Sequence, residues 1–282
     1  MVSIKLAISS DNHLDVNRIN INDALNFQAT WLKQNQVDYY LYGGDLFNDL
    51  AKTKQYFSQL QKLLPYTTVL YILGNHDLIN NAPFNEIEHP ASSSYLHNRF
   101  IDLPNTNWRI IGNNGWYDYS FSTYHDQPQK VQNWKKVYWL DSSVDQNISD
   151  KHRMYNVLFH VNQQLSLAAS ADKQVIFLTH FAPHHELLAP KPATVNSPRR
   201  EYFYQMINAM MGSDRLGKLL EESGIVKYAF YGHLHGIHPP LKHENVIYLN
   251  QAVGVKNKRV NEWQVTDFFS QWKTTLRVIE VN

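Results

Sequence analysis

The sequence of 282 residues contains no cysteine. This absence excludes disulfide bonds, zinc sites built on thiolates, iron–sulfur clusters and a cysteine nucleophile. Any metal ion that the chain binds must therefore be held by oxygen atoms and imidazole nitrogens.

The sequence also lacks an excess of charge of one sign and any long hydrophobic run. The formal net charge is +1, so no global basic field draws the protein onto nucleic acid or an anionic membrane. No stretch approaches the roughly 18 apolar residues of a membrane span. The apolar opening, Ile4 to Ile8, has no basic leader and no small-residue cleavage site, so it is predicted to be a strand and not a signal peptide. The expected location is the cytoplasm, without a membrane partner.

Short apolar runs alternate with helical patterns along the chain, which indicates an α/β fold. The predicted strands are residues 4–9, 39–42, 68–73, 108–111, 174–179, 227–231, 246–249 and 275–281. Apolar residues at helical spacing predict helices over 24–31, 56–64, 154–168 and 206–220. These stripes are interpreted as core faces.

Three segments are polar and poorly periodic: residues 80–107, 115–150 and 183–202. Loops longer than about 12–15 residues in a compact domain tend to be functional or mobile. We interpret these segments as long loops or cap insertions in a single domain that spans residues 1–282.

Five short motifs each follow a predicted strand. They are SDNHLD at 10–15, GGDLFND at 43–49, GNHD at 74–77, LTH at 178–180 and GHLH at 232–235. Ligands of open α/β sheets bind outside the carboxyl ends of the strands, so the five loops are expected to converge. The two-residue spacing of Asp11 and His13, repeated in His233 and His235, would send both side chains of each pair to one side of an extended segment. Mixed oxygen and nitrogen ligands suit manganese, iron or zinc.

The five blocks, D-x-H, G-D, G-N-H-D, a lone His and G-H-x-H, occur in the order typical of the calcineurin-like metallophosphoesterases, and the chain resembles that family. The resemblance implies two packed mixed β-sheets flanked by helices. It also implies a metal-dependent phosphoesterase that acts on a small-molecule phosphate ester. The expected reaction is attack on a phosphate diester or monoester, with the diester favoured, by a hydroxide that bridges two metals.

The resemblance implies a role for each motif residue. The expected metal ligands are Asp11, His13 and His235 for the first ion, Asn75, His180 and His233 for the second, and Asp45 as the bridge. Two cations about 3.5–4 Å apart can clamp a phosphate and activate a water.

The resemblance also makes His76 the acid that protonates the leaving group, with Asp77 orienting it. Such an acid is often worth about 10² to 10⁴ in rate. One departure concerns Asn48, where many family members carry Asp. This difference affects the residues around the ligands and leaves the ligand set intact.

Other residues have two open interpretations. The aromatic run 115–125 forms either a wall of the substrate pocket or an ordinary packed loop. Arg199 and Arg200 have the geometry to grip a phosphate, although a solvated pair is the preferred interpretation. The histidines outside the motifs are interpreted as ordinary residues, with His184 the best exception.

Two alternative functions remain open. A catalytically weak, metal-bound scaffold or binding protein would keep the fold, but would be expected to have lost ligands or the acid. A nuclease acting on short nucleic acid would share the metal chemistry, and the near-neutral charge counts against a broad nucleic-acid groove. The sequence does not specify an oligomeric state.

Overall fold

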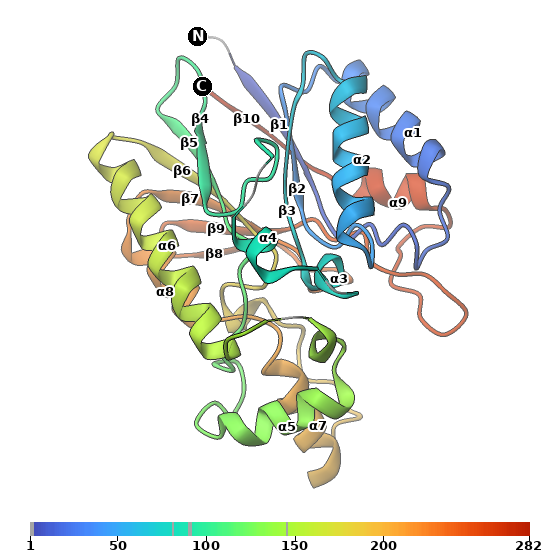
Figure 1. The fold of residues 1–282 in the computed structure, drawn as a ribbon, viewed down its shortest axis with the longest axis vertical. Helices are drawn as coiled ribbons and strands as arrows, with labels where there is room; N and C mark the ends of the chain where they lie inside the picture. The colour runs from blue at the N-terminus through green and yellow to red at the C-terminus, as the bar shows by residue number, and fades with distance from the viewer. Residues whose placement is uncertain (1–2, 81, 90–91, 145) are drawn as a thin grey trace.

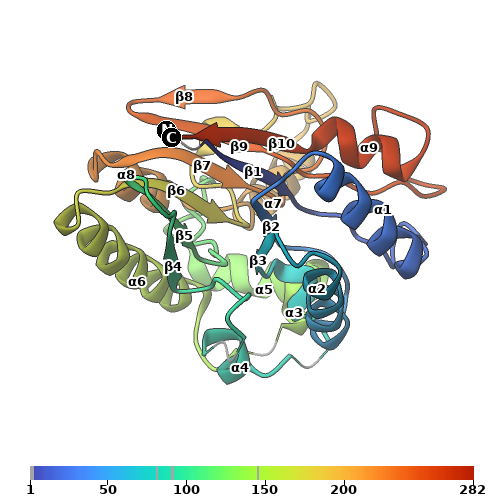
Figure 2. The same ribbon diagram turned by 90° about the horizontal axis from the view of Figure 1, so that it is seen from above.

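The computed structural model describes residues 3–80, 82–89, 92–144 and 146–282. Two β-sheets pack face to face, and helices cover their outer faces (Figures 1 and 2). This arrangement confirms the predicted α/β fold with two mixed sheets flanked by helices.

The four-stranded sheet has the order β10-β1-β2-β3. Its strands are β1 (Ile4–Ser9), β2 (Tyr39–Gly43), β3 (Thr68–Ile72) and β10 (Arg277–Val281). The first three strands are parallel, and β10 pairs with β1 in the antiparallel direction.

The six-stranded sheet has the order β4-β5-β6-β7-β9-β8. Its strands are β4 (Arg99–Asp102), β5 (Trp108–Gly112), β6 (Gln174–Thr179), β7 (Val226–Tyr231), β8 (Leu241–His243) and β9 (Val246–Asn250). The central strands β5, β6, β7 and β9 are parallel, and the edge strands β4 and β8 are antiparallel to their neighbours.

The facing sides of the two sheets enclose an aliphatic layer. Leu6, Ile8, Ile72, Ile176 and Leu178 belong to this cluster and are fully buried. The other face of each sheet is covered by helices, so the central strands are buried on both faces. This explains why they appear in the sequence as nearly continuous apolar runs.

Helices cover the outer face of each sheet (Figure 2). The four-stranded sheet is covered by α1 (Ile21–Gln34), α2 (Leu50–Leu63) and α9 (Phe268–Thr275), and the six-stranded sheet by α6 (Asp150–Ser170) and α8 (Asp214–Glu222). Side chains cap several of these helices: Asn20 accepts from the first turn of α1, and Ser149 from the first turn of α6. Such caps satisfy N–H groups that have no partner within the helix.

A smaller group of elements lies at the end of the sandwich opposite the termini, where α5 and α7 pack together (Figure 1). We call this group the cap and define it as α5 (Pro128–Tyr138), Trp139, the 3₁₀ turns η1 (Leu140–Ser143) and η2 (His185–Leu187), residues 188–197, α7 (Pro198–Asn208) and residues 209–211. Two further short helices, α3 (Asn75–Leu78) and α4 (Phe84–Glu88), follow β3.

The segments interpreted as long loops or cap insertions contain regular elements. Residues 80–107 contain α4 and β4, 115–150 contain α5 and η1, and 183–202 contain η2 and the start of α7. Strand β8 was not predicted. The helix predicted over 206–220 is two helices, α7 and α8, separated by residues 209–213. The last strand was predicted over 275–281 but begins at Arg277, because Thr275 is the last residue of α9.

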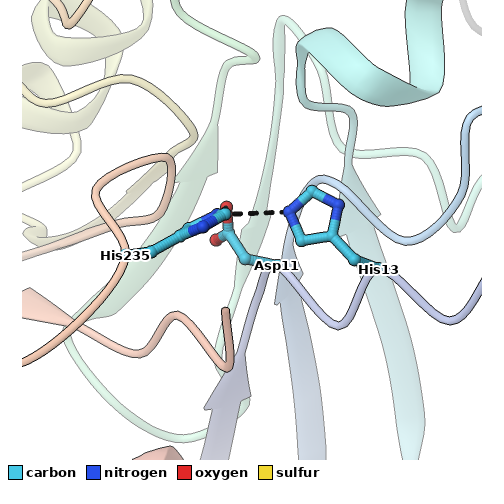
Figure 3. A group of neighbouring side chains, drawn as sticks. All are labelled: Asp11, His13 and His235. Carbon is cyan, nitrogen blue, oxygen red and sulfur yellow. Dashed lines mark hydrogen bonds and ion pairs between the residues drawn. The ribbon is translucent and has the colours of Figure 1, made fainter. Parts of the chain in front are cut away.

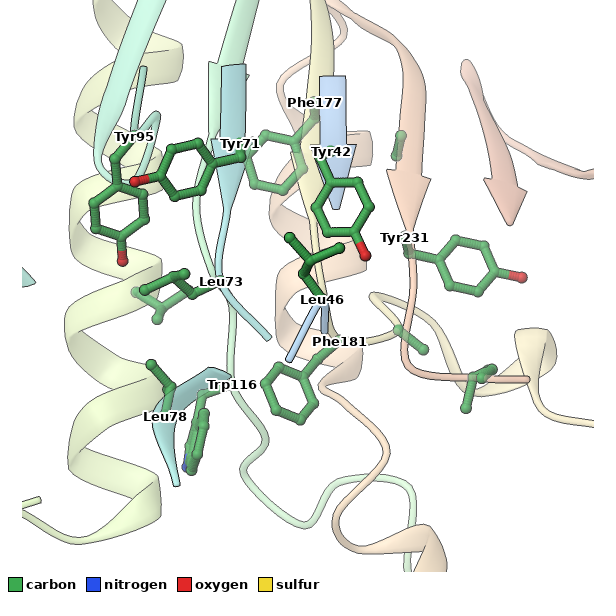
Figure 4. Packing of buried hydrophobic residues seen from close by; sticks show 14 of the residues in the cluster. Tyr42, Leu46, Tyr71, Leu73, Leu78, Tyr95, Trp116, Phe177, Phe181 and Tyr231 are labelled. Atoms are coloured by element: carbon green, nitrogen blue, oxygen red, sulfur yellow. The ribbon is translucent and has the colours of Figure 1, made fainter. Parts of the chain in front are cut away.

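Most of the aromatic run 115–125 packs in the core, where Figure 4 shows Trp116, and the run does not line the cavity beside the cap. Trp116, Tyr117 and Tyr119 are fully buried. The indole of Trp116 donates to Asp150 at 2.8 Å, and the hydroxyl of Tyr119 donates to the same carboxylate at 2.6 Å. Of the two interpretations, the packed loop is therefore correct.

None of the helices in the described part of the chain combines the length and apolar character needed to cross a bilayer.

Candidate metal centre

The five motifs meet at one end of the two sheets. Each follows a parallel strand: β1 leads to Asp11, β2 to Asp45, β3 to Asn75, β6 to His180 and β7 to His233. Since parallel strands end at the same edge, the loops that follow them are brought together. The predicted convergence of the motifs is thus observed.

The first predicted set of ligands converges on one point (Figure 3). Nε2 of His13 lies 3.1 Å from Nε2 of His235, which lies 3.2 Å from Oδ1 of Asp11. Asp11 and His13 are fully buried. Bonds of about 2.0–2.2 Å to one zinc-like ion hold neighbouring ligand atoms roughly this far apart.

The second set is arranged in the same way around an amide oxygen. Nε2 of His180 and Nδ1 of His233 each lie 3.1 Å from Oδ1 of Asn75. The amide nitrogen of Asn75 donates to Asp141 at 2.8 Å, which turns its oxygen towards the two imidazoles. An oxygen and two nitrogens therefore face one another.

Asp45 lies between the two sets. Its Oδ2 is 3.4 Å from Nε2 of His180 in one set and 3.8 Å from Nε2 of His13 in the other. Its Oδ1 accepts a hydrogen bond from the backbone N–H of His76 at 2.8 Å. One carboxylate oxygen thus faces both sets, which is the position that a bridging ligand needs.

The donor set fits metal ions better than it fits a hydrogen-bond network. Oδ2 of Asp11 is buried without a hydrogen-bond partner, whereas most buried polar atoms have one. Nε2 of His233 is likewise buried without a hydrogen-bond partner. Nitrogen and oxygen ligands without sulfur suit manganese, iron or zinc.

The backbone at this site is unusual, because four ligands lie in the left-handed region. The φ angles are 55° for Asp11, 43° for His13, 62° for Asp45 and 64° for His233. This conformation costs of order 1–3 kcal/mol for a residue other than glycine and is concentrated at functional sites. The expectation that Asp11 and His13 lie on an extended segment is wrong, since their side chains reach the site through turns.

Two glycines allow the ligands to approach the backbone closely. A Cβ on Gly74 would collide with Asp45, and one on Gly232 would collide with Oδ2 of Asp11. Neither glycine needs a positive φ angle, so these positions require glycine for lack of space and not for turn geometry.

His76 lies beside the ligands, with its ring centroid 4.6 Å from that of His13. Its Nδ1 lies 2.7 Å from Oδ1 of Asn48, so Nδ1–H donates to this amide and Nε2 is left for the substrate side. Asn48, the residue that departs from the family pattern, is therefore the one that orients the predicted acid.

The expected role of Asp77 as the residue that orients His76 is not observed. The carboxylate is fully buried and accepts hydrogen bonds from several backbone N–H groups and one hydroxyl. These donors are the N–H groups of Asp45 at 2.7 Å, Gly74 at 2.9 Å, Leu46 at 3.2 Å and Phe47 at 3.3 Å, and the hydroxyl of Thr53 at 2.6 Å. Asp77 thus fixes the loop that carries the bridging carboxylate.

Charge within the cluster is balanced by protons when no metal is bound. Burial acts to lower the pKa of His180, but Asp45 outweighs it and raises this pKa to about 9. Burial likewise opposes the effect of Asp11 and Glu262, which raise the pKa of His235 to about 10. Two imidazolium groups would then supply positive charge that bound cations supply in the metal-loaded protein.

The other two imidazoles behave in the opposite way. Burial, followed by the charge of His76, lowers the pKa of His13 well below its ordinary value. Burial and the charge of His180 do the same for His233. These two rings are neutral at physiological pH, which is the form that binds metal.

A family model described as calcineurin-like phosphoesterase matches residues 4–236, which include all five motifs. The chain belongs to the calcineurin-like phosphoesterase family. Members of this family typically bind two metal ions, and the buried histidine and aspartate groups described above are the candidates in this chain.

The chain is similar to solved structures at low sequence identity, and the first of those named here shares its fold. A dimetal phosphatase from Danio rerio is 13% identical, with a TM-score of 0.54 over 88% of this chain and 86% of that one. GAP50, the anchor in the inner membrane complex of Plasmodium, is 12% identical, with a TM-score of 0.49 over 92% and 76% of the two chains. YfkN, a calcineurin-like phosphoesterase from Bacillus subtilis, is 14% identical, with a TM-score of 0.42 over 88% and 81%. No curated protein sequence matches the chain significantly.

Two carboxylates that hold metal ligands of this phosphoesterase in place were not predicted from the sequence. Asp141 in η1 holds the amide of Asn75, as described above. Glu262 accepts from Nδ1 of His235 at 2.7 Å and from the backbone N–H of Val255 at 2.7 Å. A carboxylate behind a metal-binding histidine fixes its tautomer and orientation. Neither residue lies in a motif, so the sequence offered no signal for them.

A cavity of about 580 Å³ opens from the metal centre of this phosphoesterase towards the cap. Its floor contains Asp45, Asn75, His76, His233 and His235. The cap supplies its walls, namely Tyr138, Trp139, Leu140, Leu188, Ala189, Pro190, Pro192, Tyr204, Ile207, Asn208 and Met211, and the remaining lining residues are Leu234, His238 and Glu262.

Arg199 and Arg200 do not line this cavity. Both are exposed on α7, and Arg200 donates to the carbonyl of Thr194 at 2.8 Å. His184 lies in a separate group with Glu221 and His243, and its Nδ1 accepts from the N–H of Glu186 at 3.1 Å. The structure thus places all three outside the site.

Proposed function

We propose that this protein is a dinuclear metal-dependent phosphodiesterase that hydrolyses a small-molecule phosphate ester. The observation that carries the proposal is the convergence of two sets of ligands, joined by Asp45, beside His76 and at the base of a cavity. Asp11, His13 and His235 would hold one ion.

The second ion would be held by Asn75, His180 and His233. When bound, manganese, iron or zinc ions would supply Lewis acidity that activates water and stabilises negative charge on the phosphate. The protein itself supplies rigid ligands, the carboxylates behind them, and the cavity.

The chemical step is a displacement at phosphorus. A P–O bond forms to the oxygen of water, which gives up one proton to the solvent, and the P–O bond to the leaving group breaks. His76 donates its proton from Nε2 to the departing oxygen, while the bond from Nδ1–H to Asn48 keeps the ring in place. The products are an alcohol and a phosphate monoester.

The charge of the cavity supports a diester over a monoester. In the part of the chain that the structure describes, no lysine or arginine lines the cavity, and Glu262 lies on its wall. A diester carries one negative charge, whereas a monoester at neutral pH carries nearly two and gains more from a cationic side chain. The same lack of cationic residues weighs against a nuclease, which must hold several phosphates.

The test is hydrolysis of bis-p-nitrophenyl phosphate beside p-nitrophenyl phosphate by metal-stripped protein resupplied with manganese, iron or zinc. Bound metal is counted in parallel. We expect two ions per chain and faster turnover of the diester. Two bound ions without turnover of either ester would instead support a metal-bound binding protein, and faster turnover of the monoester would overturn the diester preference.

A further inference from the structure

The cavity wall that faces the metal centre is apolar and belongs to the cap. Tyr138, Leu140 and Ile207 line it, yet their exposed fractions are 59%, 44% and 38%. Single exposed apolar side chains are ordinary, but a group of them around one cavity marks a binding surface. These three side chains come from α5, η1 and α7, so the cap gathers them from separate parts of the chain.

This wall is held at a fixed position relative to the metal ligands. The indole N–H of Trp139 donates to Oδ2 of Asp141 at 3.1 Å, and Oδ1 of the same carboxylate accepts from Asn75 at 2.8 Å. Tyr138 packs edge-on against Phe203 of α7, with ring centroids 5.4 Å apart. One carboxylate thus connects a ring of the wall to a metal ligand.

The wall lacks the permanently cationic side chains that bind a second anionic group most strongly. Among the residues that the structure describes, no lysine or arginine lines the cavity, although these are the residues that bind additional phosphate or carboxylate groups. Among the described residues outside the predicted ligands, Glu262 is the one carboxylate that lines the cavity, and its charge repels anions. The volume of about 580 Å³ is within the range of sites that enclose a drug-sized organic group.

We propose that the substrate carries an aromatic or similarly flat apolar group on its phosphate, with no further phosphate or carboxylate, and that this group lies against Tyr138, Leu140 and Ile207. The inference rests on the proposed phosphodiesterase function, because it assumes that the phosphate sits at the metal centre. Burying a ring against the wall would then add binding free energy through the hydrophobic effect.

The first test compares three phosphonates that share one head group: methylphosphonate, phenylphosphonate and 4-carboxyphenylphosphonate. Their dissociation constants are measured by calorimetry on the metal-loaded protein. Phenylphosphonate is expected to bind about tenfold to a hundredfold more tightly than methylphosphonate, the range for burying a phenyl ring. The carboxylate should remove most of this gain. Equal affinities for the methyl and phenyl compounds, or no loss with the carboxylate, would overturn the proposal.

The second test locates the effect. The double variant Tyr138→Ala/Ile207→Ala should bring the ratio of the phenyl and methyl dissociation constants towards one. The control is Tyr66→Ala, because Tyr66 is 96% exposed and does not line the cavity. It should keep the wild-type ratio. A wild-type ratio in the double variant would refute the assignment of the wall.

The two proposals fail in different ways. If the protein hydrolyses diesters but binds the methyl and phenyl compounds equally, the substrate class is wrong and the phosphodiesterase function stands. If it prefers the phenyl compound but hydrolyses no ester, the apolar site is real and the catalytic function is wrong.

Discussion

Asp77→Asn is the substitution that best separates the role seen in the structure from the role implied by the family resemblance. The carboxylate of Asp77 accepts from the N–H groups of Asp45, Gly74, Leu46 and Phe47, and from the hydroxyl of Thr53. Its two oxygens face separate groups of these donors. Whichever way an asparagine amide is turned, its NH₂ group faces at least two N–H donors.

The magnitude follows from these lost acceptors. A buried donor without a partner costs about 1–3 kcal/mol, so two of them should lower the free energy of unfolding by about 2–6 kcal/mol. Most of this range lies below the total stability of a typical domain, about 5–15 kcal/mol, so the variant is expected to fold. The loop that carries Asp45 would be loosened, and the metal affinity should fall with it.

The assay is urea unfolding of the metal-free protein, with a lower midpoint at an unchanged slope as the expected result. The matched control is Asp49→Asn. Asp49 caps α2 by one bond to the N–H of Lys52, and asparagine caps helices equally well, so stability should change by about 0.5 kcal/mol or less. The reasoning is refuted if Asp77→Asn keeps the wild-type midpoint and metal content while it slows mainly esters with poor leaving groups. That pattern would mean that Asp77 acts on His76.

Three further changes test separate parts of the site. Asn48→Ala removes the contact that orients His76 and should slow esters with poor leaving groups about tenfold, with both metals retained; an equal loss for all leaving groups would contradict this. Gly232→Ala pushes a methyl group into a ligand carboxylate and should lower the metal content measured by plasma mass spectrometry, whereas normal content would show that the loop can move aside. Because the pKa values of His180 and His235 in the metal-free chain are about 9 and 10, loading both metals at pH 7.5 should release about two protons, measured by calorimetry in two buffers. The same two protonations contribute stability to the metal-free fold that is fully present below about pH 6.5, the ordinary pKa of histidine, and is lost as the pH rises through 9 and 10. The absence of proton release on metal loading would contradict this assignment of charge. So would a stability of the metal-free protein that does not fall between about pH 6.5 and 10.

The predicted strands and motif positions agree with the structure because both depend on local sequence. The central strands are buried on both faces, so their apolar runs are continuous and end where the motifs begin. The backbone of the site was not predictable in the same way. Asp11 and Asp45 adopt left-handed φ angles, which are imposed by the surrounding fold and not by the residue type.

The surroundings of the site depend on contacts between distant segments, which explains why they were missed. Glu262 lies 27 positions after His235, in a segment without a repeating pattern. The aromatic run 115–125 was compatible with either a pocket wall or a packed loop, and the aromatic part of the wall comes instead from Tyr138 and Trp139 of the cap. A run of aromatic residues is equally compatible with a packed core and with a pocket wall. The contact that holds Trp116 in the core is a hydrogen bond to the distant carboxylate of Asp150, which no sequence pattern predicts.

The number of metal ions bound per chain, in the wild type and in Asp45→Asn, tests the central claim most directly. Asparagine tolerates the left-handed φ angle of 62° at this position, so the substitution removes the bridging charge without adding backbone strain. The account predicts two ions in the wild type after dialysis and the loss of at least one in the variant. Two tightly bound ions in Asp45→Asn, or none in the wild type resupplied with manganese, iron or zinc, would contradict it.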